Sequence, residues 1–339
     1  MLPFAYERAE SADGAVRLAS GVAADAPASA DAHVRFIAGG TNVTDYMRLG
    51  VMRPERLVDV NPLTERLGAI RLDEAGLHLG ALVRMAEAED HEGIARDYPV
   101  IADTLRLAAT RQIRNMASLG GNVLQRTRCD YFRKTSFPCN KREPGSGCAA
   151  LEGVNRRHAL LGTSERCIAA YAGDFAQALI ALDAEVTVTG PSGERRLPFA
   201  DLHREPGERP EVETVLGPAD LIVGFRIPAG PWTRRSRYVK VRDRESYQFA
   251  VTAAAVALDL DGESVRDVRI ALGGVATVPW RARAAEDLLK GRRLDEAAAR
   301  EAAEAAFEGA VPRGQNGFKV PLGKETVVRA LLETMAMKV

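Results

Sequence analysis

Four cysteines are the residues of this sequence whose type and spacing most clearly indicate chemistry. Cys129, Cys139, Cys148 and Cys167 are all the cysteines of the 339-residue chain, and they follow the spacing C-x9-C-x8-C-x18-C. Inert core thiols would be scattered among the apolar segments, so this clustering indicates a shared partner. Zinc sites usually contain C-x2-4-C pairs, which are absent here, whereas a four-iron cluster accepts ligands from well-separated positions. The spacing therefore favours a [4Fe-4S] cluster, with zinc, two disulfides or unligated thiols as alternatives.

The charges around the cysteines support the same interpretation. From residue 126 to residue 167 the sequence contains nine Lys and Arg residues against four Asp and Glu residues. Four thiolates around a cubane leave an anionic centre, which basic side chains and glycine amides would offset. His158 is the one histidine in this stretch and could donate to a sulfur, although an isolated histidine is more often structural. A solvated basic loop with incidental thiols is the structural alternative.

Two glycine turns form a second candidate site. Residues 34–45 contain a predicted buried strand that ends in the turn Gly39-Gly40-Thr41-Asn42, and a similar turn occurs at residues 117–124 after a predicted helix. Without a Cβ, a glycine backbone can take a positive φ and approach a ligand closely, which leaves amides and hydroxyls free to bind phosphate oxygens. The first turn alone is explained equally well by an ordinary strand–turn–helix corner.

The elements that would position these residues alternate between strands and helices. Apolar spacing predicts one long helix over residues 99–117, and Asp174 is expected to cap a helix within residues 171–184. Residues 126–168 interrupt the pattern and are interpreted as an insertion. Strands are predicted over residues 57–61, 77–83 and 221–227, with a hairpin over residues 185–197.

A second set of elements follows the linker-like residues 228–235. Antiparallel strands are predicted over residues 236–242, 250–258 and 265–272, and helices over residues 283–289, 294–307 and 324–337. The Ala- and Glu-rich run 296–306 is expected to be a solvent-facing helix on that sheet. We therefore predict an α+β fold in two domains, residues 1–228 and residues 236–339.

The bulk composition excludes several classes of function. The chain has 46% apolar residues and a formal net charge of zero, so it carries no electrostatic signature of nucleic-acid or membrane binding. Its apolar runs, such as residues 251–258, are too short to span a bilayer. The N-terminal residues lack a basic n-region and an apolar h-region, so we expect no signal peptide, and export would need a signal on a partner.

Taken together, the motifs resemble a known family, the FAD-binding (medium) subunits of xanthine-oxidase-family molybdenum hydroxylases. The similarity is carried by residues 37–42 (Ile-Ala-Gly-Gly-Thr-Asn), residues 112–122 (Gln-Ile-Arg-Asn-Met-Ala-Ser-Leu-Gly-Gly-Asn), Gly173-Asp174 and residues 271–275 (Ala-Leu-Gly-Gly-Val). The cysteine insertion is similar to that of flavoprotein subunits of bacterial periplasmic aldehyde oxidoreductases, and a related insertion occurs in 4-hydroxybenzoyl-CoA reductase. No Gly-x-Gly-x-x-Gly motif follows a strand, which argues against a Rossmann site.

The resemblance implies two cofactors, FAD and a [4Fe-4S] cluster ligated by the four cysteines. It implies a two-part PCMH-type, vanillyl-alcohol-oxidase-like FAD-binding domain followed by a CO-dehydrogenase-flavoprotein-like α+β domain with an antiparallel sheet. Ala38 to Asn42 would wrap the pyrophosphate, Asp174 would hydrogen-bond the cofactor, and Ile222 and Lys240 would lie near the isoalloxazine. The implied FAD-binding residues are Phe36, Ile37, Ala38, Gly39, Gly40, Thr41, Asn42, Ser118, Gly120, Gly121, Asn122, Asp174, Ile222 and Lys240. No residue of this chain is implied to be catalytic.

The family also implies an oxidoreductase assembly in which this chain transfers electrons. Aldehyde oxidation would take place on a large molybdopterin subunit, a [2Fe-2S] subunit would relay the electrons, and this chain would pass them to a ferredoxin-like protein, a quinone or oxygen. The nearest resemblance implies a periplasmic location by co-export with a signal-bearing partner, with the cytoplasm as the alternative. Three other functions remain open: the flavoprotein subunit of a xanthine dehydrogenase or 4-hydroxybenzoyl-CoA reductase type enzyme, a self-sufficient FAD oxidoreductase, and a metal-binding assembly module.

Overall fold

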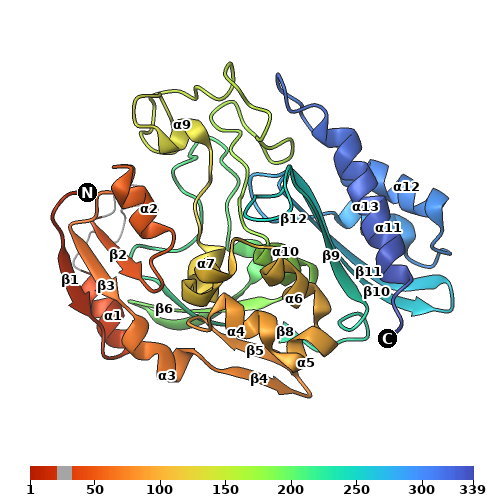
Figure 1. Cartoon of the computed structure of the whole chain (residues 1–339), viewed down its shortest axis with the longest axis horizontal. Coiled ribbons are helices and arrows are strands. Elements are labelled where there is room, and N and C mark those ends of the chain that lie inside the picture. Colours follow the sequence, from red (N-terminus) through yellow and green to blue (C-terminus); the bar gives the residue numbers. More distant parts are fainter. Residues whose placement is uncertain (21–32) are drawn as a thin grey trace.

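The computed structural model describes residues 1–20 and 33–339, and these residues form three β-sheets flanked by helices (Figure 1). A three-stranded sheet lies near the N-terminus and a four-stranded sheet lies at the opposite end, with a five-stranded sheet between them. The mixture of helices and antiparallel sheets confirms the predicted α+β class. Within the described residues, no helix has the length and apolar character needed to cross a membrane.

The N-terminal sheet is parallel, and it leads directly into the first glycine turn. Its strands are β1 (Ala5–Arg8), β3 (Arg56–Asp59) and β2 (Val34–Ile37), in that spatial order. The neighbouring helical segments are α1 (Ala12–Ala19), α2 (Val43–Arg48), η1 (Asn61–Leu63) and α3 (Thr64–Leu67). Because β2 ends at Ile37, the first glycine turn lies at the carboxyl end of this strand.

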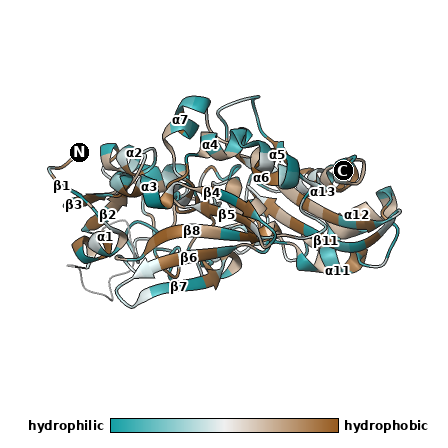
Figure 2. Ribbon diagram, turned by 90° about the horizontal axis from the view of Figure 1, so that it is seen from below, coloured by the Kyte–Doolittle hydropathy of each residue, from teal (hydrophilic) through white to brown (hydrophobic). Residues whose placement is uncertain are grey.

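The central five-stranded sheet is antiparallel and buries one face in the main core. Its strands, in spatial order, are β4 (Ile70–Asp73), β5 (Gly76–Gly80), β8 (Leu221–Pro228), β6 (Glu185–Gly190) and β7 (Gly193–Pro198). Leu79, Val186 and Phe225 are buried in one cluster with helix residues. Figure 2 shows hydrophobic ribbon along β6 and β8. The predicted hairpin of residues 185–197 is thus β6 and β7.

Helices cover this sheet, and one of them differs from its prediction. They are α4 (Met85–Asp90), α5 (Glu92–Asp97), α6 (Pro99–Arg106), α7 (Arg111–Met116), α8 (Leu119–Val123), α10 (Phe175–Ala181) and the short η2 (Phe199–Asp201). The single helix predicted over residues 99–117 is wrong, because the chain breaks between α6 and α7. Ala109 takes φ +48°, and the side chain of Thr110 then caps α7 by accepting a hydrogen bond from the Ile113 amide.

The C-terminal part is an antiparallel sheet with helices on it, as predicted. The strands are β12 (Trp280–Arg281), β11 (Ser264–Gly273), β10 (Thr252–Asp261) and β9 (Ser236–Val241), and the helices are α11 (Arg283–Leu289), α12 (Glu296–Ala306) and α13 (Lys319–Met335). Helix α12 buries five of its seven alanines and exposes its charged residues, as expected. Helix α13 starts at Lys319, five residues earlier than predicted, because Pro321 is compatible with a first helical turn.

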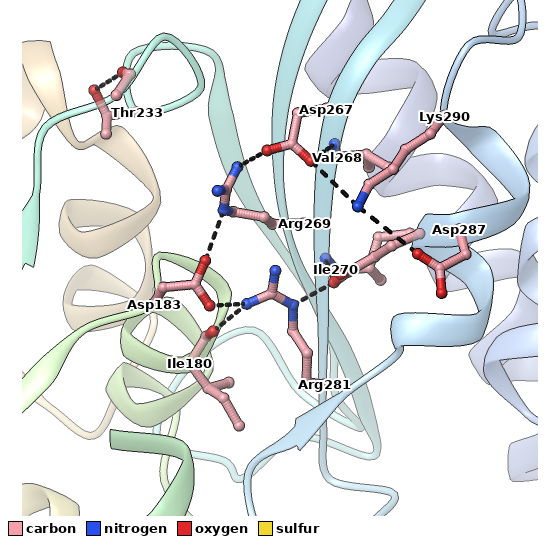
Figure 3. Close-up of polar contacts among 12 residues, drawn as sticks. Ile180, Asp183, Thr233, Asp267, Val268, Arg269, Ile270, Arg281, Asp287 and Lys290 are labelled. Carbon is pink, nitrogen blue, oxygen red and sulfur yellow. Dashed lines mark hydrogen bonds and ion pairs between the residues drawn. The ribbon is translucent and has the colours of Figure 1, made fainter. Parts of the chain in front are cut away.

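Charged side chains join the central part of the chain to the C-terminal sheet (Figure 3). Asp183, which follows α10, accepts hydrogen bonds from Arg269 Nε at 3.0 Å and from Arg281 Nη1 at 2.8 Å. Arg281 Nη1 also donates to the carbonyl of Ile180 at 2.6 Å, and the Arg269 guanidinium lies 3.4 Å from the centroid of the Trp232 ring. Since Arg269 and Arg281 belong to β11 and β12, these contacts hold that sheet against α10.

The cysteine insertion is built mostly of turns, with the short helix α9 (Asp130–Arg133) near its start (Figure 1). Its later part is held by the C-terminal residues rather than by its own secondary structure. Asn316 donates to the carbonyl of Ala159 at 3.0 Å, and the fully buried Lys319 donates to the carbonyl of His158 at 2.9 Å. Burial lowers the pKa of Lys319 to about 7. The insertion is therefore anchored on the C-terminal sheet and helices.

Candidate functional site

One large cavity, with a volume of about 740 Å³, is enclosed by segments that lie far apart in the sequence. The turn after β2, helix α8, the start of α10, and strands β8 and β9 all contribute to its wall. Every residue that the resemblance assigned to FAD, from Phe36 to Lys240, lines this cavity. The fold thus brings the complete predicted set together in one place.

The first glycine turn is built so that it can touch the second. Gly40 has φ +71°, a conformation that side-chain-bearing residues rarely adopt. A Cβ on Gly39 would lie 1.8 Å from the carbonyl oxygen of Met116, which no packing adjustment of a side chain could relieve. Met116 ends α7, directly before the second turn. The missing side chain at Gly39 is therefore what allows the two turns to form one continuous wall.

The second glycine turn is the first turn of α8. The Ser118 hydroxyl caps this helix by accepting a hydrogen bond from the Gly121 amide at 3.2 Å. The Gly120 amide donates to the carbonyl of Ala81 at 2.8 Å, and a Cβ on Gly120 would lie 3.0 Å from the Cβ of Ala81. These contacts fix the backbone of the turn against the end of β5.

Two asparagine side chains at the cavity leave polar atoms without protein partners. Nδ2 of Asn42 and Oδ1 of Asn122 are buried, and neither has a hydrogen-bond partner among the described residues. The other polar atoms of the two side chains are engaged: Asn42 Oδ1 accepts from the Arg126 amide at 3.2 Å, and Asn122 Nδ2 contacts the Met85 sulfur at 3.3 Å. Because buried polar groups are costly without partners, the two free atoms mark positions for polar groups of a ligand. The residues present therefore fit FAD.

Asp174, Tyr238 and Lys240 form a buried polar cluster on another wall of the cavity. The carboxylate of Asp174 accepts from Tyr238 Oη at 2.6 Å and from Lys240 Nζ at 2.7 Å. Burial, together with the charge of Asp174, raises the pKa of Tyr238 well above its usual value. Asp174 is the N-cap residue of α10, as predicted, but its side chain makes no capping hydrogen bond. Its two carboxylate oxygens are drawn to Tyr238 and Lys240 instead.

Replacing Asp174 with asparagine is expected to destabilise the chain by about 3–5 kcal/mol, because Lys240 would remain as a buried charge without its counter-ion. Only 1% of the Lys240 side chain is exposed, so solvent cannot compensate. Asp243→Asn is the matched control, since Asp243 and Arg156 form a partly exposed pair worth at most about 1 kcal/mol. Urea unfolding of both variants measures the difference. Equal destabilisation by the two substitutions would contradict the assigned role of Asp174.

Several cavity residues carried no local signal in the sequence. Glu213 and Arg126 line the cavity, but Glu213 lies in a proline- and charge-rich passage and Arg126 was counted only as part of the basic loop. Tyr247 and Phe249 follow the Lys- and Arg-containing strand β9, a position from which aromatic side chains either cover a bound flavin or pack in the core. Their exposed fractions are 55% and 43%, and both line the cavity, so the core-packing alternative is wrong.

The four cysteines surround a second, much smaller cavity. All four line it, and none is in a disulfide, so the disulfide alternative is wrong for this structure. Cys139 and Cys148 face each other across an isolated antiparallel bridge. The amides of Arg142 and Glu143 donate to the Cys139 carbonyl at 3.0 and 2.8 Å. The insertion thus brings thiols that are up to 38 residues apart in the sequence to the wall of one small cavity.

Burial raises the pKa of the Cys129, Cys139 and Cys167 thiols, so these three stay protonated unless a cation binds. Burial raises the pKa of Cys129 to about 12 and that of Cys167 to about 11. His158 Nε2 lies 3.2 Å from the Cys129 sulfur, as its candidate role requires, and burial lowers the pKa of His158 to about 4. Across residues 1–20 and 33–339, no three His, Cys, Asp or Glu side chains are grouped so that they could hold a metal ion.

Comparison with known proteins decides the family. Residues 2–230 match the family of the FAD binding domain in molybdopterin dehydrogenase, and residues 237–334 match the CO dehydrogenase flavoprotein C-terminal domain. The chain belongs to this family of FAD-binding subunits. It is accordingly an oxidoreductase subunit of the molybdenum hydroxylase family, and its matched domain supports FAD binding. The 740 Å³ cavity is the candidate site for this cofactor and is called the FAD cavity below.

Relatives are similar over most of their length. The chain is 45% identical to the aldehyde oxidoreductase FAD-binding subunit PaoB of Escherichia coli, over 89% of this chain and 92% of that protein. It is 25% identical to the carbon monoxide dehydrogenase medium chain of Hydrogenophaga pseudoflava, over 98% and 97% of the two chains. One of these proteins is named as a subunit of an enzyme and the other as a chain of an enzyme.

Solved structures confirm the two-part fold. The reconstituted CO dehydrogenase from Oligotropha carboxidovorans superimposes with a TM-score of 0.76 at 23% identity, over 100% of both chains. Quinoline 2-oxidoreductase from Pseudomonas putida 86 gives a TM-score of 0.74 at 22% identity, over 98% of this chain and 97% of that chain. At these identities the likeness concerns the fold alone.

Proposed function

We propose that this chain is the FAD- and [4Fe-4S]-containing electron-transfer subunit of a heterotrimeric, molybdenum-dependent aldehyde oxidoreductase. The observation that carries the proposal is that the FAD cavity and the cysteine cavity share the segment 126–129. Arg126 and Arg128 line the first cavity, and Cys129 lines the second. Two redox sites so close together favour electron transfer. The 45% identity to an aldehyde oxidoreductase FAD-binding subunit supports the substrate class.

The wall of the FAD cavity supports a role without substrate chemistry. Among the described residues that line it there is no histidine, and each of its four carboxylates is ion-paired. The pairs are Asp45 with Arg133, Asp174 with Lys240, Glu213 with Arg126, and Asp220 with Arg195. A self-sufficient FAD oxidoreductase would need a free general base next to the flavin. We therefore place aldehyde oxidation on a partner subunit.

The cysteine cavity supports the second cofactor of the proposal. A cubane is ligated at its corners, so its four thiolates surround it rather than converge on a single ion, and four cysteines surround this cavity. Cluster binding would deprotonate thiols whose pKa is otherwise raised by burial. Bound FAD supplies one- and two-electron chemistry and a bound cubane supplies one-electron chemistry. The residues of this chain would hold and orient these groups.

The proposal is tested on the complex that contains this chain. We expect it to co-purify with a [2Fe-2S] subunit and a molybdopterin subunit, and we expect the purified chain alone to show flavin absorption plus a broad iron–sulfur shoulder. We expect the isolated chain to oxidise no aldehyde, while the complex does so with a ferredoxin-like protein, a quinone or oxygen as acceptor. Aldehyde turnover by the isolated, molybdenum-free chain would instead favour a self-sufficient flavoenzyme. If the complex turned over xanthine or a benzoyl-CoA substrate but no aldehyde, the result would favour the flavoprotein subunit of a xanthine dehydrogenase or 4-hydroxybenzoyl-CoA reductase type enzyme.

The compartment forms a separate part of the proposal. We propose a periplasmic location reached by co-export, because the cysteine insertion resembles that of periplasmic aldehyde oxidoreductases. Cell fractionation of the native complex tests it. Recovery of aldehyde oxidation activity in the cytoplasmic fraction alone would contradict this part and leave the redox assignment intact.

A further inference from the structure

Two cations share one carboxylate between the FAD cavity and the cysteine cavity. The carboxylate of Glu213 accepts hydrogen bonds from Arg126 Nε and, at 3.1 Å, from Lys141 Nζ. Lys141 also donates to the carbonyl of Pro210 at 2.9 Å. Arg126 and Lys141 belong to the start and the middle of the insertion, and Glu213 belongs to the passage before β8. Arg126 and Lys141 are both buried, with 6% and 9% of their surface exposed.

Arg126 lines the FAD cavity, and Lys141 lies against the cysteine cavity. Lys141 lines it together with the four cysteines. The guanidinium of Arg126 lies 4.7 Å from the centroid of the Phe132 ring, and Phe132 is a fully buried residue of the cavity wall. Nη1 and Nη2 of Arg126 are buried and have no hydrogen-bond partner in the described part of the chain. These two guanidinium nitrogens of Arg126 therefore point into the protein rather than into solvent.

The charges of this group do not balance. Two positive side chains and one negative side chain leave one net positive charge in a buried position. An uncompensated buried charge is strongly unfavourable, so an anion is needed nearby. A cubane ligated by four thiolates is anionic and would lie in the cavity that Lys141 lines. Neutral thiols, by contrast, would give Lys141 no anionic partner besides the carboxylate that it shares with Arg126.

We propose that Arg126 and Lys141, held in place by Glu213, are the fixed counter-charge of the iron–sulfur cluster and set its reduction potential. The inference rests on the proposed function, because it requires the cluster. Reduction adds an electron to an anionic centre, so a nearby positive charge favours the reduced state and a nearby negative charge disfavours it. All three are positioning residues, since they act on the cluster through their charge and are not its ligands.

The sign of the effect separates this role from a structural one. Lys141→Met removes a positive charge and should shift the midpoint potential of the cluster to more negative values. Glu213→Gln removes the negative charge and should shift it to more positive values. Lys141→Arg keeps the charge and should keep the wild-type potential. Lys134→Met is the matched control, because Lys134 is an exposed lysine of the same insertion and makes no side-chain contact with this group.

The measurement is a redox titration of the intact complex followed by EPR, with iron and FAD content determined for every variant. Opposite shifts in Lys141→Met and Glu213→Gln, with Lys134→Met unchanged, are the expected result. If the midpoint potential shifted with the same sign in both variants, or did not shift in iron-loaded variants, this inference would be overturned and the proposed function would stand. If Glu213→Gln does not fold, the two variants at position 141 test the inference. The midpoint potential must then shift in Lys141→Met and stay unchanged in Lys141→Arg. A wild-type complex with FAD but without this iron would overturn the proposed cluster, and this inference with it.

Discussion

Alanine in place of Gly39 is expected to give a chain that binds no FAD. The added Cβ would lie 1.8 Å from the carbonyl oxygen of Met116 and 2.5 Å from its carbonyl carbon. Both contacts are with backbone, so the only escape is to move the first glycine turn away from the second. Since the two turns form one wall of the FAD cavity, their separation removes the surface that holds the cofactor.

The remainder of the protein should tolerate this substitution. The C-terminal sheet and its helices have a core of their own that contains neither turn. The ratio of flavin to protein absorbance after gel filtration measures the loss, and circular dichroism verifies the fold. Gly317→Ala is the matched control, because its Cβ would only contact the Cβ of Pro312 at 3.7 Å. Full flavin occupancy in Gly39→Ala would show that the turns do not need to touch for FAD to bind.

The glycine turns could be predicted from sequence because their signal is local. A strand followed by Gly39 and Gly40 requires a backbone that only glycine permits, and the structure shows a positive φ at Gly40 and a steric requirement at Gly39. The C-terminal sheet could be predicted for the same reason, since the apolar runs of β10 and β11 lie within the strands themselves.

Other features depend on contacts between distant residues, which no local pattern encodes. Asp174 has the residue type and place of a helix cap, yet Lys240, 66 positions away, competes for the same carboxylate. Ala109 lies within an apolar periodicity that suggests a continuous helix, yet tertiary packing holds it at φ +48°. Glu213 could not be recognised in its linker-like passage, because its role arises only when Arg126 and Lys141 meet it in the fold.

Serine in place of Cys139 is expected to eliminate the iron of the cysteine cavity. Cys139 contributes one of four thiols, and its bridge to Cys148 joins two arms of the insertion. A serine hydroxyl is a poor ligand for a cluster that is normally held by thiolates. Apparent metal-binding energies of about 10–16 kcal/mol at structural zinc sites indicate how strongly a ligated metal can contribute to folding. We therefore expect residues 126–168 to become susceptible to proteolysis in Cys139→Ser, while the C-terminal core stays intact.

Ser136→Ala is the control for this prediction, since Ser136 is an exposed hydroxyl residue of the same insertion. Iron per chain, the EPR signal and limited proteolysis are measured on both variants and on the wild type. Loss of iron in Cys139→Ser but not in Ser136→Ala assigns the metal to the cysteine cavity. Zinc in the wild type, or an iron-free wild type with two disulfides, would contradict the prediction. The turns of the insertion would then be held by its contacts with the C-terminal part, such as that of Lys319 with His158, without help from a cluster.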